Sequence, residues 1–163
     1  VGMQASSAIN KMLDNFNRKI TEDMQARLDE LGMSLSEVIN VASLIEKEAA
    51  NDSERPVIAS VIYNRLNYDT PLGIDAAVLY PYPEHEGAPT AEMLAKDDPY
   101  NTRIKLGLPP TPISNPGIAS INAALWPDAT DYFYYALDTA TGTHQFFTNE
   151  GDFNSFVATQ DYE

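Results

Sequence analysis

Two glutamates, Glu46 and Glu48, lie near the end of the apolar stretch L-I-E-K-E-A-A-N-D at residues 44–52. A carboxyl group set into an apolar helix face is costly to ionise, and such groups occur mainly where the carboxyl does chemistry. On a regular helix, positions two residues apart point about 160° away from each other. The pair therefore cannot act together on one reaction centre, which excludes a two-carboxylate glycosidase built from these residues alone. One of them can still serve as a single acid.

The helical pattern does not decide which glutamate is the acid. Glu46 lies nearer the centre of the apolar stripe, so burial alone favours Glu46 as the group with a perturbed pKa. Glu48 is closer to the helix C-terminus, where unpaired carbonyls place negative charge, and Asp52 follows four residues later. Both effects raise a carboxyl pKa, as a general acid requires. The geometry leans toward Glu48, and the alternative is that both are ordinary helix-edge charges with Lys47 pairing locally.

Three helices are predicted to position these groups. Apolar residues recur at helical spacing over residues 5–31, and Gly32 is expected to end that helix. A second helix over about 34–50 carries both glutamates. A third helix follows to about residue 66, with Pro56 tolerated in its first turn.

The composition changes between residues 67 and 116, which hold nine of the eleven prolines. Such density leaves room only for short elements, with a helical patch at 90–96 and a short strand or turn at 74–80. Beyond them, 118–125 predicts a helix and 132–148 a β-hairpin whose tyrosines pack the sheet. The prediction is an α+β fold with a helical N-terminal half, a long proline-rich segment and a small antiparallel sheet with a C-terminal hairpin.

Composition excludes several classes of function. The 163 residues carry 24 acidic against 10 basic side chains, a net charge of −14, which argues against nucleic acid and anionic lipid as partners. The absence of cysteine excludes disulfides, thiolate catalysis and zinc–sulfur sites. The two histidines, His85 and His144, are far apart, so neither a metal site nor a cofactor is expected. No segment approaches the roughly 20 apolar residues of a membrane helix.

Several separated motifs occur in an order that resembles one known family. They are A-S-L-I-E-K-E-A (42–49), V-I-A-S-V-I-Y-N-R-L (57–66), P-L-G-I-D (71–75), Y-N-T (100–102) and G-L-P-P-T-P-I-S-N-P-G (107–117), followed by Y-F-Y-Y-A-L-D and G-T-H-Q-F-F-T-N. Over roughly 34–156 they resemble the catalytic domain of the YceG-like family, the endolytic murein transglycosylases also called MltG. The resemblance implies an N-terminal helical extension at 1–33 and a YceG-like catalytic domain at 34–163.

The resemblance implies a lytic enzyme acting on the glycan strands of peptidoglycan. The family's catalytic glutamate matches Glu48, and Glu46 is the runner-up acid. Glu48 would protonate the glycosidic oxygen between N-acetylmuramic acid and N-acetylglucosamine, then act as base on the muramic C6 hydroxyl to give a 1,6-anhydro end. The alternatives are a non-catalytic peptidoglycan-binding scaffold and a muramidase-type hydrolase in which Asp75 orients water.

The family also implies a location at the extracytoplasmic face of the bacterial cytoplasmic membrane. Its members carry an N-terminal anchor and a LysM-like region that are not in this sequence, and cell-wall synthesis proteins are the expected protein partners. The chain departs from the family pattern at three places: L-G-I-D-A-A replaces L-Q-[ST]-D-P-T, Arg103 replaces a tyrosine, and Asp152-Phe153 replaces a histidine. These departures affect the saccharide subsites and leave the acid unchanged.

Six further polar residues are candidates for substrate binding. Asn64 and Arg65 end the third helix and can aim side chains into a cleft, although Arg65 can instead pair with an acid. Asp75 can hold Arg65, bind a sugar hydroxyl or cap a turn. The other three offer donors, acceptors and a ring for stacking on sugar: Tyr100, Asn101 and Thr102. His144 is expected to be structural.

Overall fold

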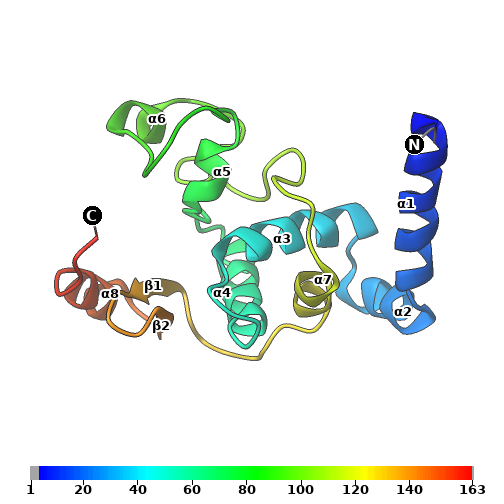
Figure 1. The fold of residues 1–163 in the computed structure, drawn as a ribbon. Helices are drawn as coiled ribbons and strands as arrows, with labels where there is room; N and C mark the ends of the chain where they lie inside the picture. Colours follow the sequence, from blue (N-terminus) through cyan, green and yellow to red (C-terminus); the bar gives the residue numbers. More distant parts are fainter. Residues whose placement is uncertain (1–3, 163) are drawn as a thin grey trace.

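Three helices make the centre of the molecule in the computed structural model, which describes residues 4–162. They are α3 (Leu35–Glu48), α4 (Arg55–Asn67) and α7 (Ile118–Leu125), and they pack on one another (Figure 1). The largest fully buried side chains come chiefly from these helices and include Leu44, Ile45, Ile58, Ile62 and Leu125. Within residues 4–162, no helix is both long enough and apolar enough to cross a membrane.

The helix that carries the two glutamates is fixed at both ends by local signals. Ser34 caps α3 by accepting a hydrogen bond from the Glu37 backbone, and the Glu37 carboxylate accepts one from the Ser34 backbone in return. This capping box satisfies two donors that helix geometry leaves unpaired. The helix ends at Glu48, slightly before the expected residue 50, so Glu48 occupies the last turn.

The N-terminal helix predicted over 5–31 is wrong in one respect, because the structure breaks it into α1 (Ala5–Lys19) and α2 (Glu22–Leu31). At the break, Thr21 adopts an extended conformation and its hydroxyl accepts from the Met24 backbone at 3.2 Å, which starts a new helix. Gly32 ends α2 in the left-handed conformation, with φ of 64°, as predicted. Helix α2 packs on α7, whereas α1 extends to the side opposite the C-terminus (Figure 1).

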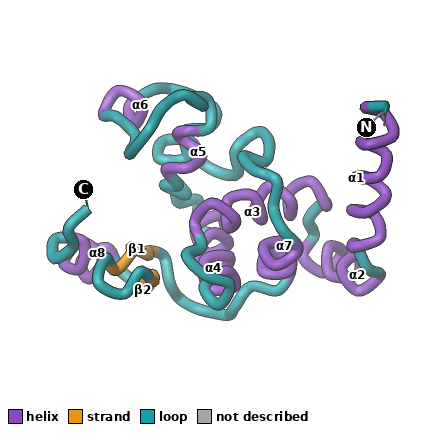
Figure 2. Tube along the Cα trace, in the orientation of Figure 1, coloured by secondary structure: helices purple, strands orange, loops and turns teal. Residues whose placement is uncertain are grey.

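The proline-rich segment contains two short helices and is otherwise loop and turn (Figure 2). The helical patch predicted at 90–96 is present as α6 (Ala91–Ala95), capped by the Thr90 hydroxyl. The strand or turn predicted at 74–80 is wrong, because the chain forms α5 (Asp75–Leu79) there. A carboxylate in the first turn favours a helix N-terminus, which is where Asp75 lies.

The C-terminal part consists of the predicted hairpin and one helix that was not predicted. Strands β1 (Tyr134–Asp138) and β2 (Thr143–Phe147) pair antiparallel. Helix α8 (Glu150–Val157) follows, capped by the Asn149 side chain at the backbone of Asp152, and it packs on both strands. Helices on one side and a small antiparallel sheet on the other confirm the α+β fold.

Candidate active site

Glu48 lies in a cavity of about 610 Å³ between the helical core and the hairpin, called the Glu48 cavity below. Its walls come from the end of α3, from α4, from the chain just before α5, and from β1, β2 and α8. The polar side chains among them are Glu48, Arg65, Asp75, Arg103, Tyr134, Tyr135, His144 and Tyr162. In residues 4–162, no group of three or more histidine, aspartate or glutamate side chains is arranged to hold a metal ion.

The environment of Glu48 favours the protonated carboxyl. Burial raises the pKa of Glu48, and the nearby Asp75 charge raises it further, while the hydrogen bond from Tyr135 opposes this rise, as does the weaker charge of Arg103. Asp52, the like charge expected from the sequence, instead pairs with Arg55 at 2.9 Å. A partly buried carboxyl with a raised pKa is suited to general acid catalysis.

Glu46 has a different role, which the helical pattern did not predict. Its Oε2 atom accepts hydrogen bonds from the Ser120 hydroxyl at 2.6 Å, the Gly117 backbone at 3.1 Å and Arg55 at 3.3 Å. The hydrogen bond from Ser120 is the largest of the effects that lower the pKa of Glu46. Glu46 is therefore an ionised cap at the start of α7, and it does not line the Glu48 cavity.

Tyr135 is a site residue that the sequence analysis assigned only to sheet packing. Its hydroxyl donates a 2.8 Å hydrogen bond to Oε2 of Glu48. Burial raises the pKa of Tyr135 well above its ordinary value, and the Glu48 charge adds to this effect. The phenol therefore stays protonated and acts as a fixed donor to Glu48. The alternation of the hairpin residues gave no sign of which tyrosine would face the carboxyl.

Asn64 and Arg65 are close to the site but bind backbone. Asn64 donates to two carbonyl oxygens just before β1, each at 2.9 Å. Arg65 donates to the carbonyl oxygen of Phe133 at 2.6 Å and to those of Pro71 and Leu72 at 3.0 and 2.7 Å. The guanidinium thus joins the start of β1 to the chain before α5. Arg65 lines the Glu48 cavity, whereas Asn64 does not.

Asp75 lies in the cavity and is held by Arg103, not by Arg65. Its Oδ1 atom accepts from Nε of Arg103 at 2.8 Å and lies 2.6 Å from Nη2. Both side chains are a little under half exposed, so this ion pair is open to solvent. Arg103, one of the departures from the family pattern, is thereby brought into the Glu48 cavity beside the carboxyl that was a candidate for binding.

The structure does not bring Tyr100, Asn101 or Thr102 into the Glu48 cavity. Asn101 is buried and donates to three carbonyl oxygens in and after α6. The Thr102 hydroxyl bonds the backbone N–H and carbonyl of Ile74 at 3.0 and 3.1 Å. Tyr100 shares a hydrogen bond with Thr111. These side chains hold α5 and α6 in place and position the adjacent Arg103.

Glu54 and His144 form a nearly buried pair that was not among the candidate site residues. Oε2 of Glu54 lies 2.8 Å from Nδ1 of His144, and Oε1 accepts from the His144 backbone at 3.0 Å. Burial opposes the ionisation of Glu54, but hydrogen bonds from His144 and Ala50 outweigh it and lower the pKa of Glu54. The imidazole meets the Tyr135 ring edge-on, with centroids 5.3 Å apart.

Comparisons with known proteins, by sequence and by structure, agree on one family. A model of the YceG-like family matches residues 1–159. The endolytic murein transglycosylase of Bacillus subtilis is 40% identical over 127 residues, covering 78% of this chain and 35% of that protein. The enzyme of the same name from Streptococcus pneumoniae is 29% identical over 164 positions, covering 96% and 30%. The chain thus spans about a third of the length of these curated relatives. A crystal structure of a YceG-like protein from Listeria monocytogenes is 38% identical, with a TM-score of 0.87, covering 95% of this chain and 50% of that one.

Proposed function

This chain belongs to the YceG-like family, and from that membership we propose that it cleaves peptidoglycan glycan strands as an endolytic murein transglycosylase. The observation that carries the proposal is the Glu48 carboxyl, which is set in a cavity, has a raised pKa and accepts a hydrogen bond from Tyr135. A lytic reaction needs one group that gives a proton and then takes one back. Glu48 is placed to do both.

The proposed reaction uses Glu48 twice. The Glu48 carboxyl first gives its proton to the glycosidic oxygen between N-acetylmuramic acid and N-acetylglucosamine, and the bond from that oxygen to C1 breaks. The Glu48 carboxylate then takes the proton of the muramic C6 hydroxyl while its oxygen bonds to C1. The product is a 1,6-anhydro ring, and Glu48 is protonated again without any other proton donor.

The surroundings of Glu48 fit both halves of this cycle. Burial favours the carboxyl before bond cleavage. After cleavage, the Tyr135 hydroxyl is already oriented to stabilise the carboxylate, so little reorganisation is needed when the charge appears. The wall formed by β1 and α8 adds Leu137, Phe153 and Val157, apolar surface on which a sugar ring can lie.

A hydrolytic reaction is the second candidate, and Asp75 is the observation that favours it. Asp75 lies in the same cavity as Glu48 and could orient water. However, two nitrogens of Arg103 already contact its Oδ1 atom, so that oxygen is not free to orient water. A third possibility, a non-catalytic peptidoglycan-binding scaffold, would leave the raised pKa of Glu48 without a use.

Product analysis separates the three functions. Purified glycan strands without peptides are incubated with the protein, and the fragments are measured by mass spectrometry. We expect internal cleavage that leaves 1,6-anhydro-muramic ends. Reducing ends would support the hydrolase, and intact strands that nevertheless bind the protein would support the scaffold.

The proposal extends to domain organisation and location. Every lining residue of the Glu48 cavity lies between 48 and 162, so residues 34–163 are proposed as the catalytic domain and 1–33 as a helical extension. Action on the wall places the protein at the extracytoplasmic face of the bacterial cytoplasmic membrane, beside cell-wall synthesis proteins. Labelling by a membrane-impermeant reagent in intact cells tests this location, and protection from the label would contradict it.

A further inference from the structure

The Glu54–His144 pair is more elaborate than a link between secondary-structure elements requires. Glu54 accepts from the backbone of Ala50 at 3.1 Å and from the side chain of Asn51 at 2.8 Å, in addition to both bonds from His144. The two paired side chains are only 8% and 10% exposed. Burying a carboxylate is costly unless it is fully hydrogen-bonded, and here four donors meet that cost.

These contacts decide which nitrogen of His144 is available to a ligand. A carboxylate only accepts hydrogen bonds, so Nδ1 must carry the hydrogen that points to Glu54. In the neutral imidazole, Nε2 then holds a lone pair and acts as an acceptor. Among residues 4–162, Nε2 makes no hydrogen bond, and the His144 side chain lines the Glu48 cavity. An occupant of that cavity can therefore supply the missing donor.

Tyr135 relates the imidazole to the proposed acid. The rings of Tyr135 and His144 meet edge-on at 89°, while the Tyr135 hydroxyl bonds Glu48. Glu54 also holds the turn that directly follows α3, through its contacts with Ala50 and Asn51. The same carboxylate thus anchors the chain after Glu48 and the ring of His144, so the two cavity groups share one support.

We propose that His144 is a second substrate-contacting residue of the Glu48 cavity, and that its Nε2 atom accepts a hydrogen bond from a sugar hydroxyl of the bound glycan. The inference rests on the proposed function for the class of ligand, since saccharides carry many hydroxyl groups that can donate hydrogen bonds. It adds a group that the acid–base cycle of Glu48 does not use.

A purely structural role would make a different prediction. To tie β2 to Glu54, residue 144 needs only a donor at the position of Nδ1 and its own backbone N–H. Asparagine can supply both, because its amide nitrogen lies near the place of Nδ1, but asparagine has nothing at the place of Nε2. His144→Asn therefore separates support of the fold from contact with substrate.

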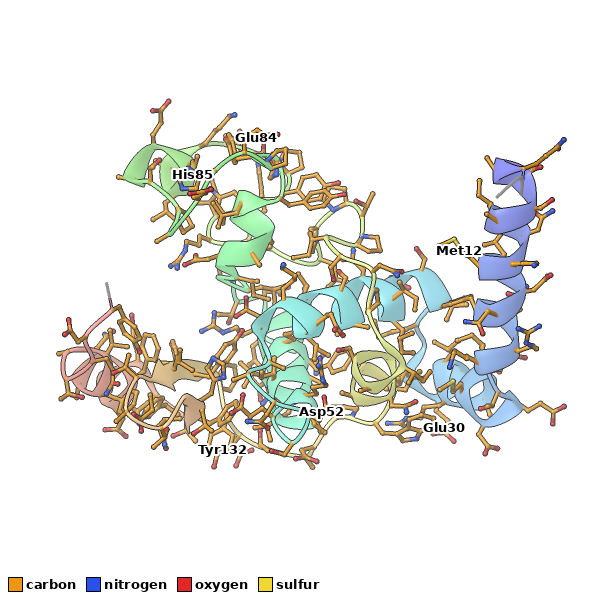
Figure 3. The ribbon with its side chains drawn as sticks, in the orientation of Figure 1. Met12, Glu30, Asp52, Glu84, His85 and Tyr132 are labelled. Atoms are coloured by element: carbon orange, nitrogen blue, oxygen red, sulfur yellow. The ribbon has the colours of Figure 1, made fainter. Side chains whose placement is uncertain are left out.

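Binding is measured in the Glu48→Gln background, which holds the substrate without cleaving it. The probe is a tetrasaccharide of alternating N-acetylglucosamine and N-acetylmuramic acid, and calorimetry gives its Kd. We expect His144→Asn to raise Kd at least tenfold. The matched control is His85→Asn, because His85 is the other histidine and lies between α5 and α6 (Figure 3), where its ring bonds the carbonyl of Ala88 and does not line the Glu48 cavity. The control should leave Kd unchanged.

A second measurement leaves His144 intact, so it is informative even if His144→Asn unfolds. Nitrogen-15 NMR of the two histidines, assigned with His85→Asn, should show the Nε2 signal of His144 move when the tetrasaccharide is added. Binding without that movement, or an unchanged Kd in folded His144→Asn, overturns the inference. Because neither readout needs cleavage, failure of the wild-type protein to make anhydro products would overturn the proposed function alone. Absence of any tetrasaccharide binding would overturn both.

Discussion

The hydroxyl of Tyr135 lies 2.8 Å from Oε2 of Glu48, although the two residues are 87 positions apart in the chain. Glu48 ends a core helix, and Tyr135 belongs to the C-terminal hairpin. Burial raises the pKa of Glu48, and the tyrosine hydroxyl of the hairpin limits the rise. The pKa of the proposed catalytic group therefore depends on a residue from a distant part of the chain.

Replacing Tyr135 with phenylalanine should alter both the rate and its pH dependence. The hydrogen bond from Tyr135 lowers the pKa of Glu48, so its loss should move the alkaline limb of the activity profile to higher pH. Because the carboxylate formed during cleavage loses a donor, kcat should fall about tenfold. The control is Tyr63→Phe, which removes a hydroxyl bound to the Ala124 carbonyl and should leave the pH profile unchanged. An identical profile in both variants would contradict the role of Tyr135.

Glutamine at positions 46 and 48 should give opposite results. Glu48→Gln removes the transferable proton, so formation of anhydro products should fall by about 10²–10⁴-fold with folding intact. Glu46→Gln should keep most activity but destabilise the fold by about 1–2 kcal/mol, because the cap of α7 loses its charge. Product yield and urea denaturation measure the two effects. Loss of activity only in Glu46→Gln would reassign the acid.

Activity should decline as pH rises through the pKa of Glu48. The protonated carboxyl is the active form, and burial raises its pKa above the ordinary value of 4.5. The decline should therefore occur at higher pH than for an ordinary glutamate. A plot of kcat/KM against pH measures it, and activity that increases steadily with pH from 4 to 8 would be inconsistent with Glu48 as the acid.

Glu48→Gln should also change how stability depends on pH. Since the folded-state pKa of Glu48 is raised, the native protein binds more protons than the unfolded chain at pH values between the two pKa values. Wild-type stability should consequently fall, relative to Glu48→Gln, as pH rises above 4.5. Thermal denaturation of both proteins from pH 4 to pH 8 measures the difference in stability. The other carboxylates are the same in both proteins, so their contributions cancel. A constant difference would show that Glu48 is not perturbed.

Gly73→Ala should disturb the support of the cavity more than a comparable change elsewhere. Gly73 has φ of 68°, and a Cβ atom there would lie 3.1 Å from Nη1 of Arg65. Gly142 has φ of 69° with no atom within 4 Å of the same position, so Gly142→Ala adds backbone strain only. We expect Gly73→Ala to cost about 1 kcal/mol more in urea denaturation and to reduce activity. Equal costs would show that the Arg65 contact is unimportant.

Elements with local signals were predictable from the sequence. Gly32 ends α2 in the conformation that glycine favours, and Ser34 with Glu37 defines the start of α3. The break between α1 and α2 was missed because Ile20 continues the apolar spacing, while the Thr21 cap signal lies inside it. Helix α8 was missed as well, although Asn149 and Asp152 form a recognisable cap.

Site residues were harder to predict, because distant parts of the chain create their environments. Burial judged from the helical pattern alone favoured Glu46 as the group with a perturbed pKa, but hydrogen bonds from Ser120 and Gly117 lower the pKa of Glu46. The polar side chains of the proline-rich segment were predicted to bind sugar. Asn101 and Thr102 instead satisfy buried backbone groups, which in an irregular segment have no helix or sheet partners.

Because Glu48 and the hairpin line the same cavity, any movement of the hairpin would change the protonation of Glu48. Burial raises the pKa of this carboxyl, whereas the hydrogen bond from Tyr135 on β1 lowers it. If the hairpin and α8 withdrew to admit a glycan strand, the exposed glutamate would lose the rise in pKa that burial causes, and it would regain that rise on closure. Thermodynamic linkage then requires that acid conditions favour the closed form. Closure would thus strengthen the hold of Glu48 on its proton in the same step that encloses the sugar.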